Sequence, residues 1–319
     1  MPKTLLITLI VVGTILFLLL IGVGGGLLWI SSNEYKPAAE ESVPVSRSLI
    51  LKPLRGQPIE LYSWNIAYAS GLVTERNVEE NIWAIQAFIS AAAGDIVFFQ
   101  EVDVNARRTY RVDQAAYFSE TWKGSSAFAF YTKCPFIPVP FPHFIGKLES
   151  GLLTLNSYSS AAERIILPES SRWPERFSRF NCCLLVERVL VQDSDAELVL
   201  VNIYLDALGS NDADFRARME LAAEFLKNEY AKGNYCVAGG DLIKSGITES
   251  AFTNPSIDEY SFFDDGWILA ADPSVPGSRF HTISGFILSP NVKLVLIQTQ
   301  DLEFRNSDHN PVKLSFSLK

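Results

Sequence analysis

The sequence predicts one α/β domain in which two packed mixed sheets are flanked by helices, preceded by one N-terminal membrane-spanning helix. From residue 59 onward, apolar runs of strand type alternate with segments of helical periodicity. The first thirty residues, in contrast, are almost wholly apolar. The whole chain of 319 residues is 48% hydrophobic and 20% charged, which is ordinary for a protein that buries a real core.

The N-terminal apolar run, Thr4–Ile30, contains no charged residue. It exceeds the roughly 20 residues that a helix needs to cross a bilayer. A cleaved signal peptide is the first alternative, although its apolar region is normally only about 7–15 residues long. Its cleavage site would lie near Pro37–Ala39. A buried core helix is disfavoured by the length and position of the run. We therefore expect a membrane anchor over residues 1–31.

The next segment, residues 32–47, is polar and rich in Ser, Glu and Pro, which is a linker composition. It is predicted to hold a domain of residues 48–319 off the membrane. Lys3 precedes the apolar run, whereas Glu34 and Lys36 follow it together with two further glutamates. The positive-inside rule then places the N-terminus in the cytoplasm and the domain outside it, in the periplasm or at the cell surface.

The domain begins with a strand–helix–strand unit: Ile59–Ile66, Thr74–Ala93 and Asp95–Gln100, with Gly94 ending the helix. The Pro-rich stretch Cys134–Gly146 is predicted as a loop. Further strands are predicted at Gly151–Leu155, Cys182–Val191, Glu197–Leu205, Tyr235–Ala238, Thr282–Leu288, Val292–Thr299 and Pro311–Phe316, and a further helix at Asp212–Tyr230.

The four cysteines are predicted to be buried free thiols, with one long-range disulfide as the alternative outside the cytoplasm. The neighbours Cys182 and Cys183 point to opposite faces of a strand and should not pair. No Cys/His spacing indicates zinc. The net charge of −9 disfavours a protein that grips the nucleic-acid backbone, and it favours small or lipidic phosphate esters over long DNA.

Polar residues stand at the ends of the apolar strands: Asn65, Glu101, Asp241 and the pair Asp308–His309. Catalytic groups in α/β folds collect in the loops just past the strands. A glutamate and two aspartates that converge there would suit Mg²⁺, which prefers oxygen ligands.

The order and setting of these residues resemble the signature segments of the endonuclease/exonuclease/phosphatase superfamily over nearly all of Ile59–Leu318. The matching segments are WN at 64–65, QE at 100–101, GGD at 239–241 and SDHNPV at 307–312. Several other stretches resemble a bacterial exported branch of this superfamily: QEVD with RRTYRVDQ following it, SGLLTLNSY, EFLKNEYAKGNY before GGD, and SGFILSPNV.

The resemblance implies a four-layered α/β/β/α sandwich and hydrolysis of a phosphate ester that depends on Mg²⁺ or Mn²⁺. By match to the family motifs, Glu101 is the principal metal ligand, Asn65 supports the metal or the phosphate, and Asp308 assists on the metal side. Asp241 holds and deprotonates the attacking water. His309 contacts the phosphate or activates the water.

Three positions depart from the family pattern. Ile243 stands where the family commonly has an asparagine that orients the nucleophile and the phosphate. Ser284 stands where the family has an aspartate paired with its histidine; a serine can accept a hydrogen bond from His309 but brings no charge. Tyr204 replaces a second histidine. The abasic-site endonuclease branch also has a tyrosine there, which contacts the phosphate; the alternative for Tyr204 is an aromatic residue at a strand end.

The sequence therefore predicts a membrane-anchored phosphoester hydrolase whose site is modified and catalytically impaired. Losing one positioning hydrogen bond in a preorganised site slows turnover by about 10² to 10³. The alternative is a non-catalytic descendant that binds a phosphorylated ligand, a lipid headgroup or a partner protein. The other two histidines, His143 and His281, are expected to be structural or exposed.

Overall fold

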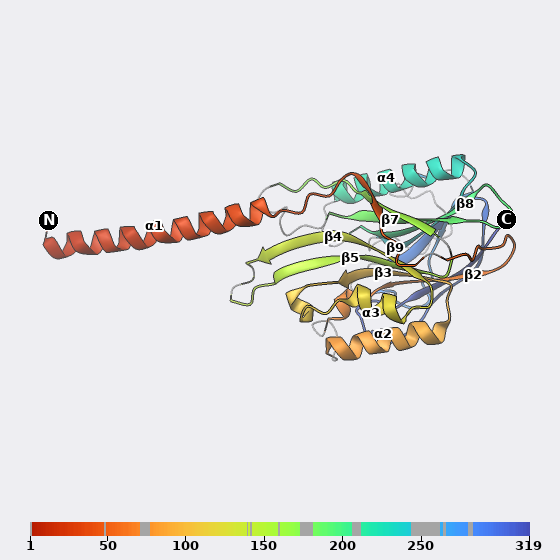
Figure 1. Ribbon diagram of the computed structural model, residues 1–319, viewed down its shortest axis with the longest axis horizontal. Coiled ribbons are helices and arrows are strands. Elements are labelled where there is room, and N and C mark those ends of the chain that lie inside the picture. Colours follow the sequence, from red (N-terminus) through yellow and green to blue (C-terminus); the bar gives the residue numbers. More distant parts are fainter. Residues whose placement is uncertain are drawn as a thin grey trace.

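The computed structural model describes residues 2–47, 49–70, 77–138, 140, 142–158, 160–172, 181–205, 212–243, 262–263, 266–279 and 283–319. Its strands form two sheets, and the helices α2, α3 and α4 lie on the outer faces of those sheets (Figure 1).

Sheet A has seven strands in the order β1 (Glu40–Val43), β6 (Ser160–Ile166), β7 (Cys183–Leu190), β8 (Glu197–Tyr204), β9 (Tyr235–Ile243), β11 (Ile283–Leu288) and β10 (Ile268–Ala270). Sheet B has six in the order β12 (Val292–Thr299), β13 (Val312–Leu318), β2 (Ile59–Asn65), β3 (Ile96–Asp103), β5 (Gly146–Asn156) and β4 (Ser125–Ile137). One parallel pair runs through each sheet, β8–β9 in sheet A and β2–β3 in sheet B, and both sheets are therefore mixed.

Helix α4 (Asp212–Ala231) covers the outer face of sheet A, and α2 (Val78–Ala92) and α3 (Gln114–Thr121) cover that of sheet B (Figure 1). Three apolar clusters fill the interfaces between these layers. Met219 and Leu226 of α4 pack on sheet A, Ile85 of α2 packs on sheet B, and residues such as Phe98 and Phe286 fill the space between the sheets. The predicted α/β/β/α sandwich is confirmed.

The fold contains elements that the sequence patterns did not indicate: β1, β4, β6, β10 and α3. The predicted loop at 134–146 is shorter in the structure, because β4 continues to Ile137 and β5 begins at Gly146. The pairing register shifts between Cys134 and Ile137, and Pro135 lies within that irregularity. A proline is tolerated in a sheet at such a position, since it has no N–H to donate to the ladder.

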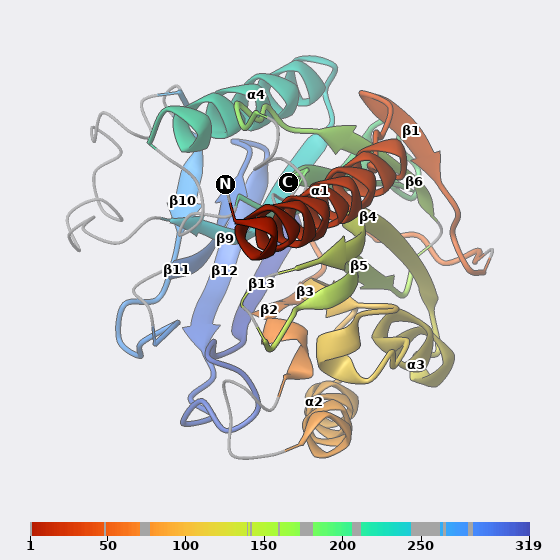
Figure 2. The ribbon, with the colours of Figure 1, turned by 90° about the vertical axis from the view of Figure 1, so that its left-hand side faces the viewer.

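Helix α1 (Lys3–Ser32) extends away from the domain (Figure 1), so that it lies in front of the sheets in the view of Figure 2. Almost all of its side chains are exposed. By length and composition it could cross a membrane, and the same properties are found in a signal sequence. The segment predicted as a polar linker contains β1, which pairs antiparallel with β6. The four cysteines are free and buried, as predicted.

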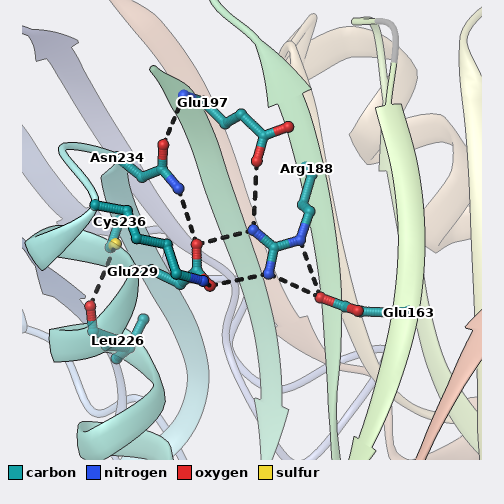
Figure 3. Close-up of polar contacts among 8 residues, drawn as sticks. Glu163, Arg188, Glu197, Leu226, Glu229, Asn234 and Cys236 are labelled. Carbon is teal, nitrogen blue, oxygen red and sulfur yellow. Dashed lines mark hydrogen bonds and ion pairs between the residues drawn. The ribbon is translucent and has the colours of Figure 1, made fainter. Parts of the chain in front are cut away.

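A charged network on the outer face of sheet A fastens the end of α4 to the strands (Figure 3). The Arg188 guanidinium donates to both carboxylate oxygens of Glu229, at 2.8 and 3.0 Å. It also binds Glu163 at 3.0 Å and Glu197 at 3.3 Å. Burial would raise the pKa of Glu229, but hydrogen bonds from Arg188, Lys232 and Asn234 lower this pKa to about 2.

Replacing Glu229 by Gln should lower the free energy of unfolding by about 3 kcal/mol at neutral pH, because one partner of a buried ion pair is removed. The wild type should lose this stabilisation as the pH falls from about 4.3, the pKa of an unfolded glutamate, toward the folded value. The variant should lack that part of the acid dependence. Thermal unfolding of the full chain in detergent across this pH range tests both effects. Glu224→Gln, on the exposed face of α4, is the control and should change neither. An identical acid dependence in Glu229→Gln and wild type would contradict the prediction.

Candidate active site at the carboxyl ends of both parallel strand pairs

The predicted site residues meet where β2 and β3 of sheet B and β8 and β9 of sheet A end. Asn65 is the last residue of β2, and Glu101 lies near the end of β3. Tyr204 ends β8 and pairs in register with Asp241 of β9. The carboxyl ends of the strands in each parallel pair point the same way. Contacts between Asn65, Glu101 and Asp241 show that the two pairs end at the same end of the sandwich.

The Asn65 side chain joins the two sheets at this site. Its Nδ2 donates hydrogen bonds to Glu101 Oε1 at 3.0 Å and to Asp241 Oδ2 at 2.7 Å. Its Oδ1 accepts a hydrogen bond from the backbone N–H of Ala67 at 2.9 Å. The Ala67 N–H fixes the orientation of the amide, since only the oxygen can accept from it. A buried amide therefore holds two carboxylates from different sheets next to each other.

Glu101 occupies an unusual backbone position. Its φ is +57°, and it lies within the register irregularity between Phe99 and Val102. Burial raises the pKa of its carboxyl group. The hydrogen bond from Asn65 and the nearby imidazole of His309 oppose this rise, whereas the carboxylates of Asp308 and Asp241 add to it. The negative charge of Glu101 is therefore only partly balanced by its hydrogen bond and by nearby positive charge. Its left-handed backbone is of a kind that is found more often at functional sites.

The side chain of Ser284 contacts Asp241. Ser284 faces Asp241 across the β9–β11 pair, and its Oγ donates to Asp241 Oδ1 at 2.6 Å. His309 Nδ1 lies 3.6 Å from the same Oδ1 and has no hydrogen-bond partner among the described residues. A hydrogen bond from His309 Nδ1 to Ser284, which a serine could accept, is therefore not formed in this structure.

The loop that carries Asp308 and His309 is fastened to β2. Trp64 Nε1 donates to the backbone oxygen of His309 at 2.9 Å, and Ser307 Oγ donates to the backbone oxygen of Asn65 at 2.8 Å. The other imidazole nitrogen, His309 Nε2, lies 3.8 Å from Asp308 Oδ1. These bonds position the imidazole between Asp241 on one side and Asp308 on the other.

A left-handed turn follows β2 directly. Residues 67–69 all have positive φ, at 46°, 60° and 47°. Such backbone costs roughly 1–2 kcal/mol per non-glycine residue, so it persists only where the surroundings support it. Three buried amides do so here: Asn65 accepts from the first residue of the turn, Gln114 donates to the carbonyl of the second, and Asn81 donates to that of the third.

This turn presents Tyr68 to an aromatic and basic cluster that the sequence reasoning missed. The Tyr131 hydroxyl lies 3.4 Å from that of Tyr68, and the Tyr131 ring stacks on Tyr204 with centroids 5.3 Å apart. The Arg108 guanidinium carbon lies 3.1 Å from the Tyr68 ring centroid. Burial raises the pKa of Tyr68 well above its usual value, and the carboxylate of Glu101 adds to this. The phenol therefore stays protonated beside the site.

Arg108 is held by a buried carboxylate. Its Nε and Nη2 each donate to Asp103 at 2.9 Å, and Ser150 and Thr109 also donate to Asp103. Asp103 belongs to the QEVD stretch and Arg108 to RRTYRVDQ. The two stretches were visible in the sequence, but their contact across the end of β3 depends on the fold. Tyr204 lies at the edge of this cluster, and its contact with phosphate stays a prediction.

The remaining predicted positions are less informative. The backbone of Ile243 pairs with residue 283 at the end of β9. His281 lies outside the described residues. His143 is exposed in the turn between β4 and β5, as expected.

The donor set can be tested against the implied metal. Within the described part of the chain, no three His, Cys, Asp or Glu side chains form a metal-binding group. Mg²⁺ commonly uses only one or two carboxylates, with water and substrate phosphate as its other ligands. Glu101 and the neighbouring Asp308 fit this kind of site. The Asn65 oxygen is directed at Ala67, so its amide fits the role of holding the carboxylates.

Comparisons with known proteins identify the fold. No protein-family model matches the sequence, and no protein of curated function matches it. The structure is similar to that of an endonuclease/exonuclease/phosphatase from Beutenbergia cavernae, with a TM-score of 0.60 and 16% identity over 82% of this chain and 72% of that one. The human Nocturnin catalytic domain with bound sulfate anion is similar with a TM-score of 0.57 and 18% identity, over 87% of this chain and 98% of that one. An endonuclease/exonuclease/phosphatase from Bacteroides vulgatus is similar with a TM-score of 0.54 and 14% identity, over 82% of this chain and 100% of that one. The predicted fold of the superfamily is confirmed, and the exported branch stays a prediction.

Replacing Asn65 by Asp should destabilise the protein by about 2 kcal/mol at neutral pH, since hydrogen bonds to two charged groups are lost and a third carboxylate is added. The shared repulsion should raise carboxyl pKa values in the folded variant, so its deficit should shrink as the pH falls toward about 4.5. Thermal unfolding at the two pH values measures this. Asn77→Asp, at the N-cap of α2, adds the same charge where aspartate is well accepted and should be nearly neutral. Equal stability of the two variants at neutral pH would refute the predicted role of the Asn65 amide.

Proposed function

We propose that this chain, which has the endonuclease/exonuclease/phosphatase fold, is a Mg²⁺-dependent phosphoester hydrolase with a modified site, anchored in a membrane by α1. The single observation that carries the proposal is the Asn65 amide, which holds Glu101 and Asp241 together at the carboxyl ends of both parallel strand pairs. The carboxylates and His309 then line one site, as a hydrolase of this fold requires.

Each residue has a role in this proposal. When bound, Mg²⁺ or Mn²⁺ would be held by Glu101 and Asp308 and would supply positive charge beside the phosphate. Asp241, held by Asn65 and Ser284, orients the attacking water and takes its proton. His309 contacts a phosphate oxygen through Nε2, because its Nδ1 faces Asp241.

A non-catalytic binding module is the second candidate, and a specific observation favours it. Ser284 brings no negative charge to His309, and His309 Nδ1 is buried without a hydrogen-bond partner among the described residues. Asp241 lies 3.6 Å from this nitrogen, too far for a hydrogen bond. A histidine that no carboxylate orients by a hydrogen bond is a poor catalyst, since loss of the orienter costs about 10⁴ in a serine protease. In this case the site would hold a phosphorylated ligand, a lipid headgroup or a partner protein and leave it uncleaved.

The location follows from the charges around α1. Lys3 precedes the helix, and Glu34, Lys36 and the glutamates of β1 follow it. By the positive-inside rule the domain lies outside the cytoplasm, in the periplasm or at the cell surface. The net charge of −9 makes a small or lipidic phosphate ester a better substrate than long DNA.

Mg²⁺ should raise the melting temperature of the wild-type chain, since a ligand that binds only the folded state stabilises it, by about 1.4 kcal/mol at ten times its dissociation constant. Glu101→Gln should abolish the shift, because it removes the principal carboxylate. Glu79→Gln, on the exposed side of α2, should keep it. Thermal unfolding with and without Mg²⁺ measures the effect. An unchanged shift in Glu101→Gln would place the metal elsewhere.

Turnover distinguishes the two candidate functions. With Mg²⁺ or Mn²⁺, the full chain should hydrolyse bis-p-nitrophenyl phosphate or a phospholipid headgroup ester faster than DNA. Asp241→Asn should reduce turnover by at least about 10², the usual effect of losing one key interaction in a preorganised site. Phosphate or nitrophenol release provides the readout, with Glu79→Gln again as the control.

A wild type without turnover on any of these substrates would favour the binding module. Activity gained by Ile243→Asn together with Ser284→Asp would then show that these two substitutions silenced the site. Full activity in Asp241→Asn would rule out the proposed role of that carboxylate.

A further inference from the structure

Helix α1 joins the domain at the same end of sheet A that carries the candidate site. One row of paired residues crosses the sheet from its edge: Glu40, Ile165, Leu184, Ile203, Gly240 and Gly285. Tyr204, Asp241 and Ser284 belong to the next row. The chain arriving from α1 enters the sheet at this level, since Ile166 N–H donates to the carbonyl of Ala39 at 2.9 Å. With strands about 4.8 Å apart, β1 lies roughly 19 Å from β9.

The connection between α1 and the sheet is short and fixed. Only residues 33–39 separate the end of α1 from β1. Within them, the Tyr35 hydroxyl accepts a hydrogen bond from buried Arg164 of β6, and the Lys133 ammonium lies 5.2 Å from the Tyr35 ring centroid. Ile30, in the last turns of the helix, is buried. The domain therefore has little freedom to turn its site away from the side on which α1 leaves.

A hairpin of sheet B projects toward the same side. Strand β3 is antiparallel to β5, and β5 is antiparallel to β4, so β4 ends in the direction of the site. Pairing continues from Ser150, opposite Asp103, to Gly146, opposite Ile137. Four residues of strand span about 13 Å, so the hairpin extends beyond the site. Figure 1 shows the end of β4 and the start of β5 on the side of the domain from which α1 leaves.

The tip has the composition of a membrane-contacting surface. Residues 134–146 include no Asp, Glu, Lys or Arg. The side chain of Ile145 is exposed, and the rings of Phe136 and Phe144 contact each other edge to face at 5.6 Å. Lys133 and Lys147 flank the apolar stretch on the two strands. Apolar and aromatic residues bordered by lysines suit the boundary between acyl chains and anionic headgroups.

We propose that α1 and the β4–β5 hairpin tip, through its described residues Phe136, Phe144 and Ile145, together hold the site end of the sandwich against the bilayer that α1 crosses. This inference rests on the proposed function: the substrates of the site are then phosphoesters carried by lipids of that same membrane. The short connection sets the height of the domain, and insertion of the tip sets its tilt, so that the ends of β3 and β9 face the headgroups.

The docking is tested on the full chain in vesicles of phosphatidylcholine and phosphatidylglycerol. An environment-sensitive NBD fluorophore is attached to Ile145→Cys or to Leu190→Cys. Leu190 is also exposed and apolar, but it ends β7, which runs antiparallel to β8, and so lies at the opposite end of the sheet. The native thiols are buried and should not react under native conditions. Emission should be blue-shifted, and quenched several-fold more by nitroxide-headgroup lipid, at position 145 than at position 190. Equal quenching at the two positions, or stronger quenching at 190, overturns the docking.

The proposal that the substrate is a membrane lipid has its own test. Ile145→Glu should lower hydrolysis of a phospholipid in these vesicles several-fold and leave hydrolysis of bis-p-nitrophenyl phosphate unchanged. The matched variant Leu190→Glu should change neither. Equal losses of hydrolysis rate on both substrates in Ile145→Glu overturn the proposal of a membrane-lipid substrate. A wild type without any turnover would count against the proposed function alone, since the quenching comparison needs no catalysis.

Discussion

The arrangement of the site depends on one amide between two sheets. Glu101 belongs to sheet B and Asp241 to sheet A, and the Asn65 side chain donates to both. One layer further into the sandwich, Gln100 donates to Asn202 of β8 at 2.8 Å, so the sheets are aligned by polar contacts as well as by apolar packing. Separating these amide donors from their acceptors in the buried interior would be costly, so sliding of one sheet over the other is strongly disfavoured.

Much of the architecture could be predicted because its elements carry strong local patterns. The run Asp95–Gln100 is apolar enough to be a buried strand, and α4 repeats its apolar residues at helical spacing. Strand β6 was missed because it contains Glu163 and Arg164, which read as surface residues. The structure buries Arg164 and gives it partners from the N-terminal segment. Strand β6 is therefore stabilised by contacts with residues far away in the sequence, which a local pattern does not indicate.

In the site, too, some features follow from local sequence patterns and others depend on distant contacts. The motifs identified which polar residues gather at the strand ends, since position relative to a strand is a local property. The direction of each hydrogen bond is not local: the Asn65 oxygen faces Ala67, and Ser284 donates to Asp241. The cluster of Tyr68, Tyr131 and Arg108 also required the fold, because its members come from three separate elements. A family pattern predicts composition at a site more readily than the contacts within it.

The pairing of β1 with β6 also affects how the domain behaves without its first residues. Strand β1 covers the edge of β6. Glu41 compensates the buried charge of Arg164, and the Tyr35 hydroxyl accepts a hydrogen bond from it. A soluble fragment beginning at residue 48 would expose a row of unpaired backbone groups along β6. Such edges recruit strands from other molecules. The N-terminal segment is thus part of the folded sheet, and a shortened form of this protein should begin before Tyr35.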